Sequence, residues 1–203
     1  MKLTWYFDLI SPFAYLALPH VLALGQPVRL EPIVFGAVLS HWGQLGPAEI
    51  PPKRLQTYRQ TQFQADQAGV PFRFPKHHPF RSLEALRLLT ALRGDADAVR
   101  AAFAFIWAEG RDPHEEFPAL RARLPAMSDE ALLAAKGQLR VATDSAIAAG
   151  VYGVPTLAIG EELFWGADSM PLAEAYLADP TLFQRGELAR LATLPLGIER
   201  RRD

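Results

Sequence analysis

The hydrophobic pattern changes its period along the chain. Residues 3–7, LTWYF, are leucine, aromatic or β-branched, which predicts a short buried strand. Apolar residues then recur at helical spacing from Phe13 to Leu24, so a helix is expected directly after the strand. Residues 28–35 alternate between apolar and polar side chains and are then apolar, which indicates a second strand. Together these elements form a β-α-β unit, whose strands should be parallel and whose connection should be right-handed.

Helical periodicity dominates residues 36–150, where no strand-like alternation of any length occurs. Loops rich in Gly and Pro separate the helical segments. The helices predicted here are 51–68, 81–93, 95–109, 116–123, 128–136 and 137–149. We therefore expect a helical subdomain inserted after the second strand.

Strand character returns near the end of the chain. Two apolar runs, 155–159 and 162–165, flank Gly160 and predict a β-hairpin. A closing helix should run from Asp168 or Ser169 to about Leu177, and another from 180 to 192. The order β-α-β, helical insertion, α-β-β-α is that of an α/β thioredoxin fold opened between its two halves. The predicted domains are a thioredoxin-like domain of residues 1–36 and 141–203, and an inserted helical subdomain of residues 37–140.

Ser11 lies where the first strand meets the first helix. It occupies the N-cap position, and Pro12 follows at the first helical position, where a missing N–H costs nothing. One interpretation is a cap, worth about 1 kcal/mol to the helix. The other is an anion site, in particular for a thiolate, because a helix N-terminus offers free N–H groups and a positive dipole end. Ligands of such sheets bind at the carboxyl ends of the parallel strands, where Ser11 lies.

A second motif, Gly153-Val154-Pro155-Thr156, precedes the third strand. Proline is confined to the beginnings and edges of strands, and in a thioredoxin fold the proline at this place has a cis peptide bond and faces the first helix. The backbone of Val154 would then be free to pair with an extended peptide. Asp168, at the next helix start, is either a cap or a ligand for an α-amino group.

The composition of the chain argues against several kinds of partner and functional site. The 203 residues carry a formal net charge of −1, which argues against a nucleic-acid partner, and the basic tail Arg200-Arg201-Arg202 is too short to change this. The chain has no cysteine, so disulfides, thiolate metal sites and a protein-borne thiol nucleophile are excluded. None of the five histidines has the spacing of a helical metal pair, and we expect His77 and His78 to lie in a solvated loop.

The amino-terminal apolar stretch does not predict export or a membrane anchor. Asp8, Pro12 and Pro19 interrupt it, so it lacks the continuous apolar core of a signal peptide. No segment approaches the ~20 apolar residues of a membrane span. A cytoplasmic enzyme without a membrane partner is expected.

Four segments carry a resemblance to a known family. They are WYFDLISPFAYLA at 5–17, GVPFRFP at 69–75, FIWAEGRD at 105–112 and GVYGVPTLAIGEELFWGADSM at 150–170. In these segments, and in the terminal LPLGIERR, the chain resembles the 2-hydroxychromene-2-carboxylate isomerases. These are glutathione-dependent enzymes related to the kappa-class glutathione transferases and, more distantly, to the DsbA oxidoreductases. The resemblance implies glutathione as cofactor and a homodimer.

The resemblance also implies roles for individual residues. Ser11 would be the catalytic residue, hydrogen-bonded to the sulfur of glutathione, and the backbone of Val154, before cis Pro155, would pair with the cysteinyl part. The remaining cofactor contacts would be Gln44, Trp165, Gly166, Ala167 and Asp168, the last four holding the γ-glutamyl end.

The chain departs from the family pattern at four of its positions. Ala167 and Gln44 replace asparagines, Ser40 stands where a substrate-facing lysine often occurs, and Gln60 replaces an aspartate. These changes put the identity of the substrate in doubt more than the binding of glutathione.

The expected chemistry follows from the missing cysteines. Ser11-Pro12-Phe13-Ala14 stands where a DsbA-like oxidoreductase has Cys-x-x-Cys, so redox exchange by the protein's own side chains is impossible. The thiol must arrive with the ligand. The resemblance implies reversible addition of the glutathione thiolate to 2-hydroxychromene-2-carboxylate, ring opening and isomerisation to trans-o-hydroxybenzylidenepyruvate. Candidates for binding the substrate carboxylate are Lys53, Arg54 and Arg81, for which the alternative is an ordinary surface charge. Candidates for packing against its aromatic ring are Phe13, Trp42 and Phe80, for which the alternative is packing in the core.

Two other functions stay open. A kappa-like glutathione transferase would use the same Ser11 site to conjugate electrophiles and would consume glutathione. A DsbA-like protein that binds glutathione without catalysis would neither isomerise the chromene nor conjugate electrophiles.

Overall fold

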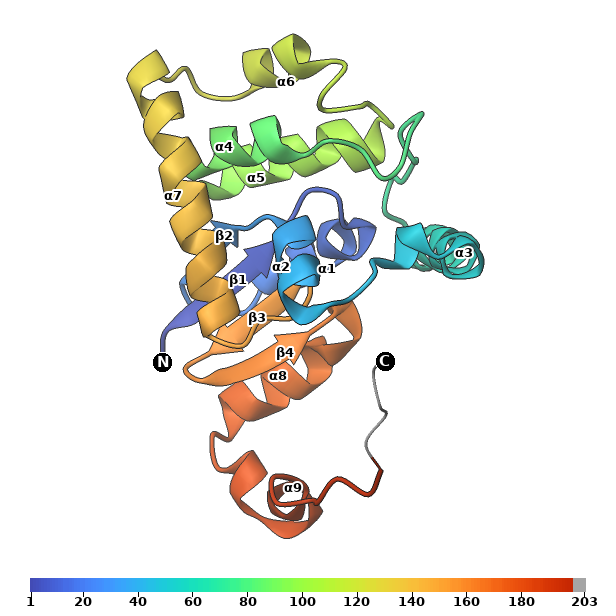
Figure 1. The fold of residues 1–203 in the computed structure, drawn as a ribbon, viewed down its shortest axis with the longest axis vertical. Coiled ribbons are helices and arrows are strands. Elements are labelled where there is room, and N and C mark those ends of the chain that lie inside the picture. Colours follow the sequence, from blue (N-terminus) through green and yellow to red (C-terminus); the bar gives the residue numbers. More distant parts are fainter. Residues whose placement is uncertain (199–203) are drawn as a thin grey trace.

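A four-stranded mixed sheet lies at the centre of the protein (Figure 1). The computed structural model describes residues 1–198; the arginines of the basic tail lie outside them. The strand order is β2-β1-β3-β4, formed by β1 (Leu3–Phe7), β2 (Val28–Pro32), β3 (Thr156–Ile159) and β4 (Glu162–Trp165). β1 pairs with β2 in parallel and with β3 antiparallel, and β3 and β4 form a hairpin. The predicted thioredoxin fold is confirmed.

The alternation along β1 gives the sheet two different faces. Leu3, Trp5 and Phe7 are almost fully buried, and the Trp5 and Phe7 rings stack with centroids 4.9 Å apart. They pack in the main core, to which α1 (Pro12–Leu22), α4 (Leu83–Ala91), α5 (Ala96–Phe103) and α8 (Met170–Ala178) contribute. Tyr6 points to the opposite face, where a smaller core includes side chains of α2 (Phe35–Trp42) and α7 (Asp129–Ala148). Helices thus cover both faces, as burial of an α/β sheet requires.

The inserted helices lie above and beside the sheet (Figure 1). α4, α5 and α6 (Phe117–Arg123) gather over its upper end, and α3 (Pro51–Ala68) projects to one side. α5 continues into a π-helical turn, Ala104–Ala108. α7 contacts both α4 in the insertion and β2 in the sheet, and it runs through the predicted domain boundary at residue 140. The boundary itself remains a prediction.

The second strand is shorter than predicted, and a helix follows it. β2 ends at Pro32 rather than at residue 35, and residues 35–42 form α2, which the sequence analysis missed. The Asp8 carboxylate accepts the N–H of Phe35 at 2.9 Å. A partner 27 residues away therefore helps to start this helix, and a local pattern cannot reveal such a contact.

The predicted division between helices 128–136 and 137–149 is wrong. Ser128 caps a single helix by accepting the N–H of Ala131 at 3.1 Å, and this helix, α7, passes through Gly137 without interruption. Glycine weakens a helix but does not end it. Here the buried residues Ala135, Leu139 and Ala146 keep one face against the protein on both sides of Gly137.

The carboxyl-terminal part divides into shorter elements than predicted. A 3₁₀ turn, Ala167–Ser169, leads into α8. The helix expected at 180–192 is instead a 3₁₀ turn, Leu182–Gln184, followed by α9 (Gly186–Leu191), because Arg185 between them has an extended backbone, with φ −139° and ψ 155°. Among residues 1–198, none of the helices is both long and apolar enough to cross a membrane.

Replacing Gly137 by Ala should stabilise the protein by about 0.5–1 kcal/mol, because glycine costs this much in a helix interior. The position is exposed, and a Cβ there would meet nothing within 4 Å. Urea unfolding would measure the change. Gly94→Ala is the contrasting control: its φ is 67°, and a Cβ would lie 1.9 Å from the Leu30 carbonyl oxygen, so this variant should lose stability. Loss of stability in Gly137→Ala would contradict the continuous helix.

Candidate active site

The loop between β1 and α1 is fixed by a buried carboxylate. Asp8, 2% exposed, accepts the N–H of Ile10 at 3.0 Å and that of Phe35 at 2.9 Å. The Ser11 N–H donates to the Asp8 carbonyl oxygen at 3.1 Å. Burial raises the pKa of the Asp8 carboxyl, and these backbone bonds together with Ser82 partly oppose the rise. Asp8 therefore fixes the course of the backbone that leads into Ser11.

Side chains from the insertion hold the carbonyl groups of the same loop. The Trp107 indole N–H donates to Leu9 O, and His78 Nε2 lies 2.9 Å from Ile10 O. The expectation of a solvated loop is wrong for His78, which is partly buried among aromatic rings, whereas His77 is exposed. Burial lowers the pKa of the His78 imidazole. A signal was present in the alternation of Phe72 and Phe74, which predicts a packed segment rather than a solvated one.

Ser11 caps α1 as the sequence predicts. Its backbone is extended, with φ −89° and ψ 114°, and its Oγ accepts the Ala14 N–H at 3.3 Å, a long bond. Ser11 is 7% exposed. The Phe13 N–H, by contrast, donates to no acceptor among the described residues. The capping interpretation is confirmed, and a free N–H with the positive helix end remains available for an anion.

The segment before β3 presents an unpaired piece of backbone. The Val154–Pro155 peptide bond is cis, as predicted. Pro155 O accepts the Gly166 N–H at 2.8 Å and Gly153 O accepts the Thr156 hydroxyl at 2.8 Å, so the residues on both sides are fixed. The N–H and C=O of Val154 have no partner among the described residues. An extended peptide could pair with them as an added strand does.

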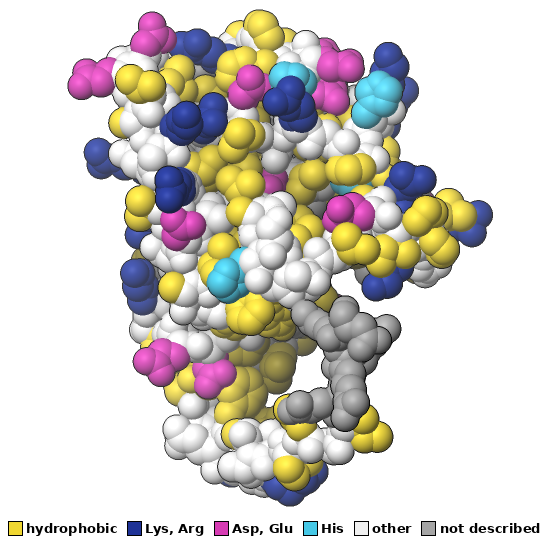
Figure 2. Space-filling view, viewed as in Figure 1, with side chains coloured by type: hydrophobic (Ala, Val, Ile, Leu, Met, Phe, Trp, Pro, Cys, Tyr) yellow, Lys and Arg dark blue, Asp and Glu magenta, His cyan; other side chains and the backbone are white. Residues whose placement is uncertain are grey.

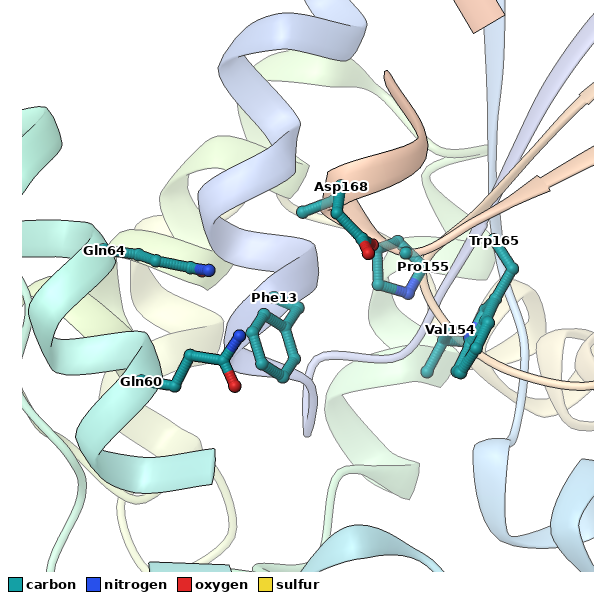
Figure 3. A pocket seen from close by; sticks show the side chains of 9 residues that line it. Phe13, Gln60, Gln64, Val154, Pro155, Trp165 and Asp168 are labelled. Atoms are coloured by element: carbon teal, nitrogen blue, oxygen red, sulfur yellow. The ribbon is translucent and has the colours of Figure 1, made fainter. Parts of the chain in front are cut away.

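A pocket of about 210 Å³ brings most of the predicted cofactor residues together (Figure 3). α3 supplies the opposite wall, where Gln60 and Gln64 point toward α1 and Phe13. Its full lining is Phe13, Gln60, Gln64, Val154, Pro155, Trp165, Gly166, Ala167 and Asp168. Gln64 was not predicted, and Gln60 was noted only as a departure from the family pattern.

Gly153 and Gly166 leave room for the side chains of Trp165 and Asp168 to lie close to the backbone. A Cβ on Gly153 would stand 2.3 Å from the Trp165 Nε1, and one on Gly166, whose φ is 89°, would stand 2.4 Å from Asp168 Oδ1. Trp165 is half exposed and packs beside Tyr152, with ring centroids 5.3 Å apart. Indole and carboxylate thus form one wall, from which the Asp168 carboxylate can hold an ammonium group.

The structure places the remaining predicted residues outside the pocket lining. The Trp42 indole N–H donates to Val151 O at 2.9 Å and so braces the segment before Val154. Phe80, 8% exposed, packs in the core against Trp107. Gln44, Lys53, Arg54 and Arg81 are exposed side chains. Ser11 is also outside the lining: it is buried at the N-cap of α1, two residues before Phe13, which does line the pocket.

Asp168 is the one charged side chain among the residues that line the pocket. A ligand carboxylate would therefore need a cation from its surroundings. Lys53 precedes Gln60 by seven residues on α3, so the two lie within about 20° of the same helix face. Arg54, the next residue, points about 100° further around the helix axis than Lys53 does. The described residues contain no cluster of three His, Asp or Glu side chains able to hold a metal ion.

Known proteins resemble this chain over most of its length. The 2-hydroxychromene-2-carboxylate isomerase of Sphingobium xenophagum is 31% identical over 190 residues, covering 86% of this chain and 97% of that protein. Glutathione S-transferase kappa 2 of Caenorhabditis elegans is 28% identical over 207 residues, covering 87% and 91%. A solved structure of a 2-hydroxychromene-2-carboxylate isomerase superposes with a TM-score of 0.77 at 26% identity, covering 95% of this chain and 98% of that one.

The family model of the DSBA-like thioredoxin domain matches residues 2–178, which include the sheet, the insertion and the whole pocket lining. The chain therefore belongs to the DSBA-like thioredoxin family, among relatives named 2-hydroxychromene-2-carboxylate isomerase.

Proposed function

We propose that this protein is a glutathione-dependent isomerase of 2-hydroxychromene-2-carboxylate or a closely similar aromatic intermediate. The observation that carries the proposal is a pocket with the N-terminal turn of α1 on one side and the unpaired backbone of Val154 with Asp168 on the other. Relatives bearing that name match nearly their whole length to this chain. The proposal includes a homodimer, which the resemblance implies, and a cytoplasmic location, which the interrupted amino-terminal apolar stretch predicts.

The groups around the pocket fit the parts of glutathione. The Val154 N–H and C=O suit its peptide backbone, and the Asp168 carboxylate suits its ammonium group. Ser11 Oγ and the Phe13 N–H suit the sulfur. Bound there, glutathione would supply the thiolate that adds to the chromene and later leaves it.

The task of Ser11 and α1 is to keep that thiol ionised. A free thiol has a pKa of roughly 8.5, so ionisation at pH 7 asks for a shift of about two units, near 3 kcal/mol. A helix N-terminus contributes up to ~2 kcal/mol, and a hydrogen bond to a charged group ~1.5–3 kcal/mol. Ser11 and the eleven-residue α1 are sufficient in magnitude.

The α3 wall would orient the second substrate. The Gln60 and Gln64 amides can donate to carbonyl or phenolic oxygens, and Phe13 offers an aromatic face. Lys53, in line with Gln60, is the best placed of the three predicted cations for the substrate carboxylate.

A kappa-like glutathione transferase is the second candidate. The lack of a cation among the lining residues favours it, because a neutral electrophile needs none. Isomerisation of the chromene without loss of glutathione supports the first function, and consumption of glutathione with an electrophile supports the second. Binding with neither reaction would leave a protein that binds glutathione without catalysis.

The replacement Ser11→Ala should abolish thiolate formation while the fold persists. Calorimetric titration should detect saturable glutathione binding to the wild type, together with the ultraviolet absorption of a thiolate. The variant should bind more weakly and lack that absorption at pH 7. The lost cap should cost about 1 kcal/mol of stability.

Ser128→Ala, which removes the N-cap of α7 far from the pocket, is the matched control for the lost cap. It should keep the thiolate absorption. Absence of wild-type binding at millimolar glutathione would contradict the proposed function.

In Gly153→Ala, the new Cβ would push the Trp165 indole away from the pocket wall. Because Trp165 is half exposed it can move outward, so the protein should fold and glutathione affinity should fall about tenfold, near 1.4 kcal/mol. Calorimetry would measure the affinity and acrylamide quenching the exposure of tryptophan. Gly137→Ala serves as the control, and unchanged affinity in Gly153→Ala would remove Trp165 from the proposed site.

Lys53→Gln should raise KM for the chromene about fivefold, since an exposed ion pair is worth up to ~1 kcal/mol. Arg54→Gln, one residue along α3 and off the pocket-facing side, should change KM less. Steady-state rates at saturating glutathione would measure both. Equal effects of the two changes would refute the assignment of Lys53.

A further inference from the structure

His78 joins the two walls of the pocket. Its Nε2 lies 2.9 Å from Ile10 O, in the residue before Ser11, and its Nδ1 lies 2.8 Å from the Tyr58 hydroxyl on α3. Tyr58 and Gln60 are two residues apart, about 200° around the helix. α3 is therefore anchored through Tyr58 on one side and forms the pocket wall through Gln60 on the other.

The imidazole is held in one orientation by its surroundings. The rings of Phe74, Phe80 and Trp107 meet it edge-on, with centroids 5.5–5.8 Å away. Burial lowers its pKa, so the ring is neutral at pH 7 and carries one proton. That proton is on Nε2, because Ile10 O can only accept.

The second ring nitrogen is then an acceptor. Nδ1 and the backbone oxygen of His78, 2.7 Å from the Tyr58 hydroxyl, share the single phenolic proton. The neutral ring thus donates to the loop of Ser11 and accepts from α3. Both bonds link residues far apart in the chain, so no local element provides either connection.

We propose that His78 is a positioning residue, which sets Ser11 against glutathione through Ile10 and sets the α3 wall against the second substrate through Tyr58. This inference rests on the proposed function. It assigns the two hydrogen bonds of one ring to two separate steps: ionisation of the thiol and orientation of the substrate.

Three substitutions separate the two bonds. In His78→Asn, the amide stands where Nδ1 was and keeps the Tyr58 contact but loses Ile10. In His78→Gln, the amide nitrogen stands where Nε2 was and keeps Ile10, while Tyr58 loses its side-chain partner and keeps only the backbone oxygen of residue 78. Tyr58→Phe removes the phenolic bond and leaves the imidazole. His77→Gln, at the exposed neighbour, is the control.

Two measurements report on the two walls. The pKa of bound glutathione comes from the ultraviolet absorption of the thiolate against pH, and KM for 2-hydroxychromene-2-carboxylate is measured at saturating glutathione. His78→Asn should raise the pKa of the bound thiol by about half a unit, which lowers the thiolate-to-thiol ratio at pH 7 about threefold, with KM unchanged. Tyr58→Phe, which removes both bonds of the phenol, should raise KM about threefold or more, and His78→Gln, which removes one, should raise it less; the thiol pKa should be unchanged in both. His77→Gln should alter neither.

A lower melting temperature with neither quantity changed would overturn the inference, as would changes of both quantities together in every variant. Failure of wild-type protein to bind glutathione would instead end the proposed function. Amide hydrogen exchange then decides the positioning role alone. Faster exchange of residues 9–15 in His78→Asn, and of α3 in Tyr58→Phe, supports it; equal exchange in all variants overturns it.

Discussion

The structure around the pocket depends on the satisfaction of polar backbone groups in a loop that has almost no contact with solvent. Residues 8–11 leave the sheet through the protein interior, where an unpaired backbone group would cost about 1–3 kcal/mol. The loop itself has too few residues to satisfy them. Side chains supply the missing partners: the Asp8 carboxylate from within the loop, and the Trp107 indole and the His78 imidazole from the insertion. Each of these bonds also fixes the direction in which α1 begins.

The same arrangement explains why an insertion of this size belongs to the site. Trp107 and His78 are contributed by the inserted segment, and α3 from that segment forms a pocket wall. The thioredoxin-like part supplies the helix N-terminus and the open backbone of Val154. Neither part forms the pocket alone, so the wall that α3 contributes can change while the sheet stays unaltered.

The sequence predicted those features that follow from local patterns. Period-two and period-3.6 hydrophobicity located the four strands and most helices, and Ser11-Pro12 identified the cap. It failed where distant partners decide the conformation. α2 begins with help from Asp8, α7 stays continuous across Gly137 because its buried face continues, and His78 leaves solvent because aromatic rings from separate segments surround it. Gln64 carries no recognisable motif, and only the packing of α3 brings it to the pocket. For Phe80 the sequence left a substrate contact and core packing open, and the structure places it in the core.

The pairing of β1 with β3 has a consequence for folding. Thr156 lies opposite Tyr6, so strands separated by most of the chain must meet before Phe13 and Val154 can line one pocket. Closing so long a loop carries the largest entropic cost in the sheet, and the contacts between β1 and β3 that offset this cost form only after the loop has closed. A partly folded chain therefore lacks the pocket. A ligand that contacts both pocket walls binds only the completely folded protein. A bound ligand would then stabilise the native state by mass action, because it would hold segments that are distant in the sequence together, as a covalent crosslink does in cysteine-containing proteins.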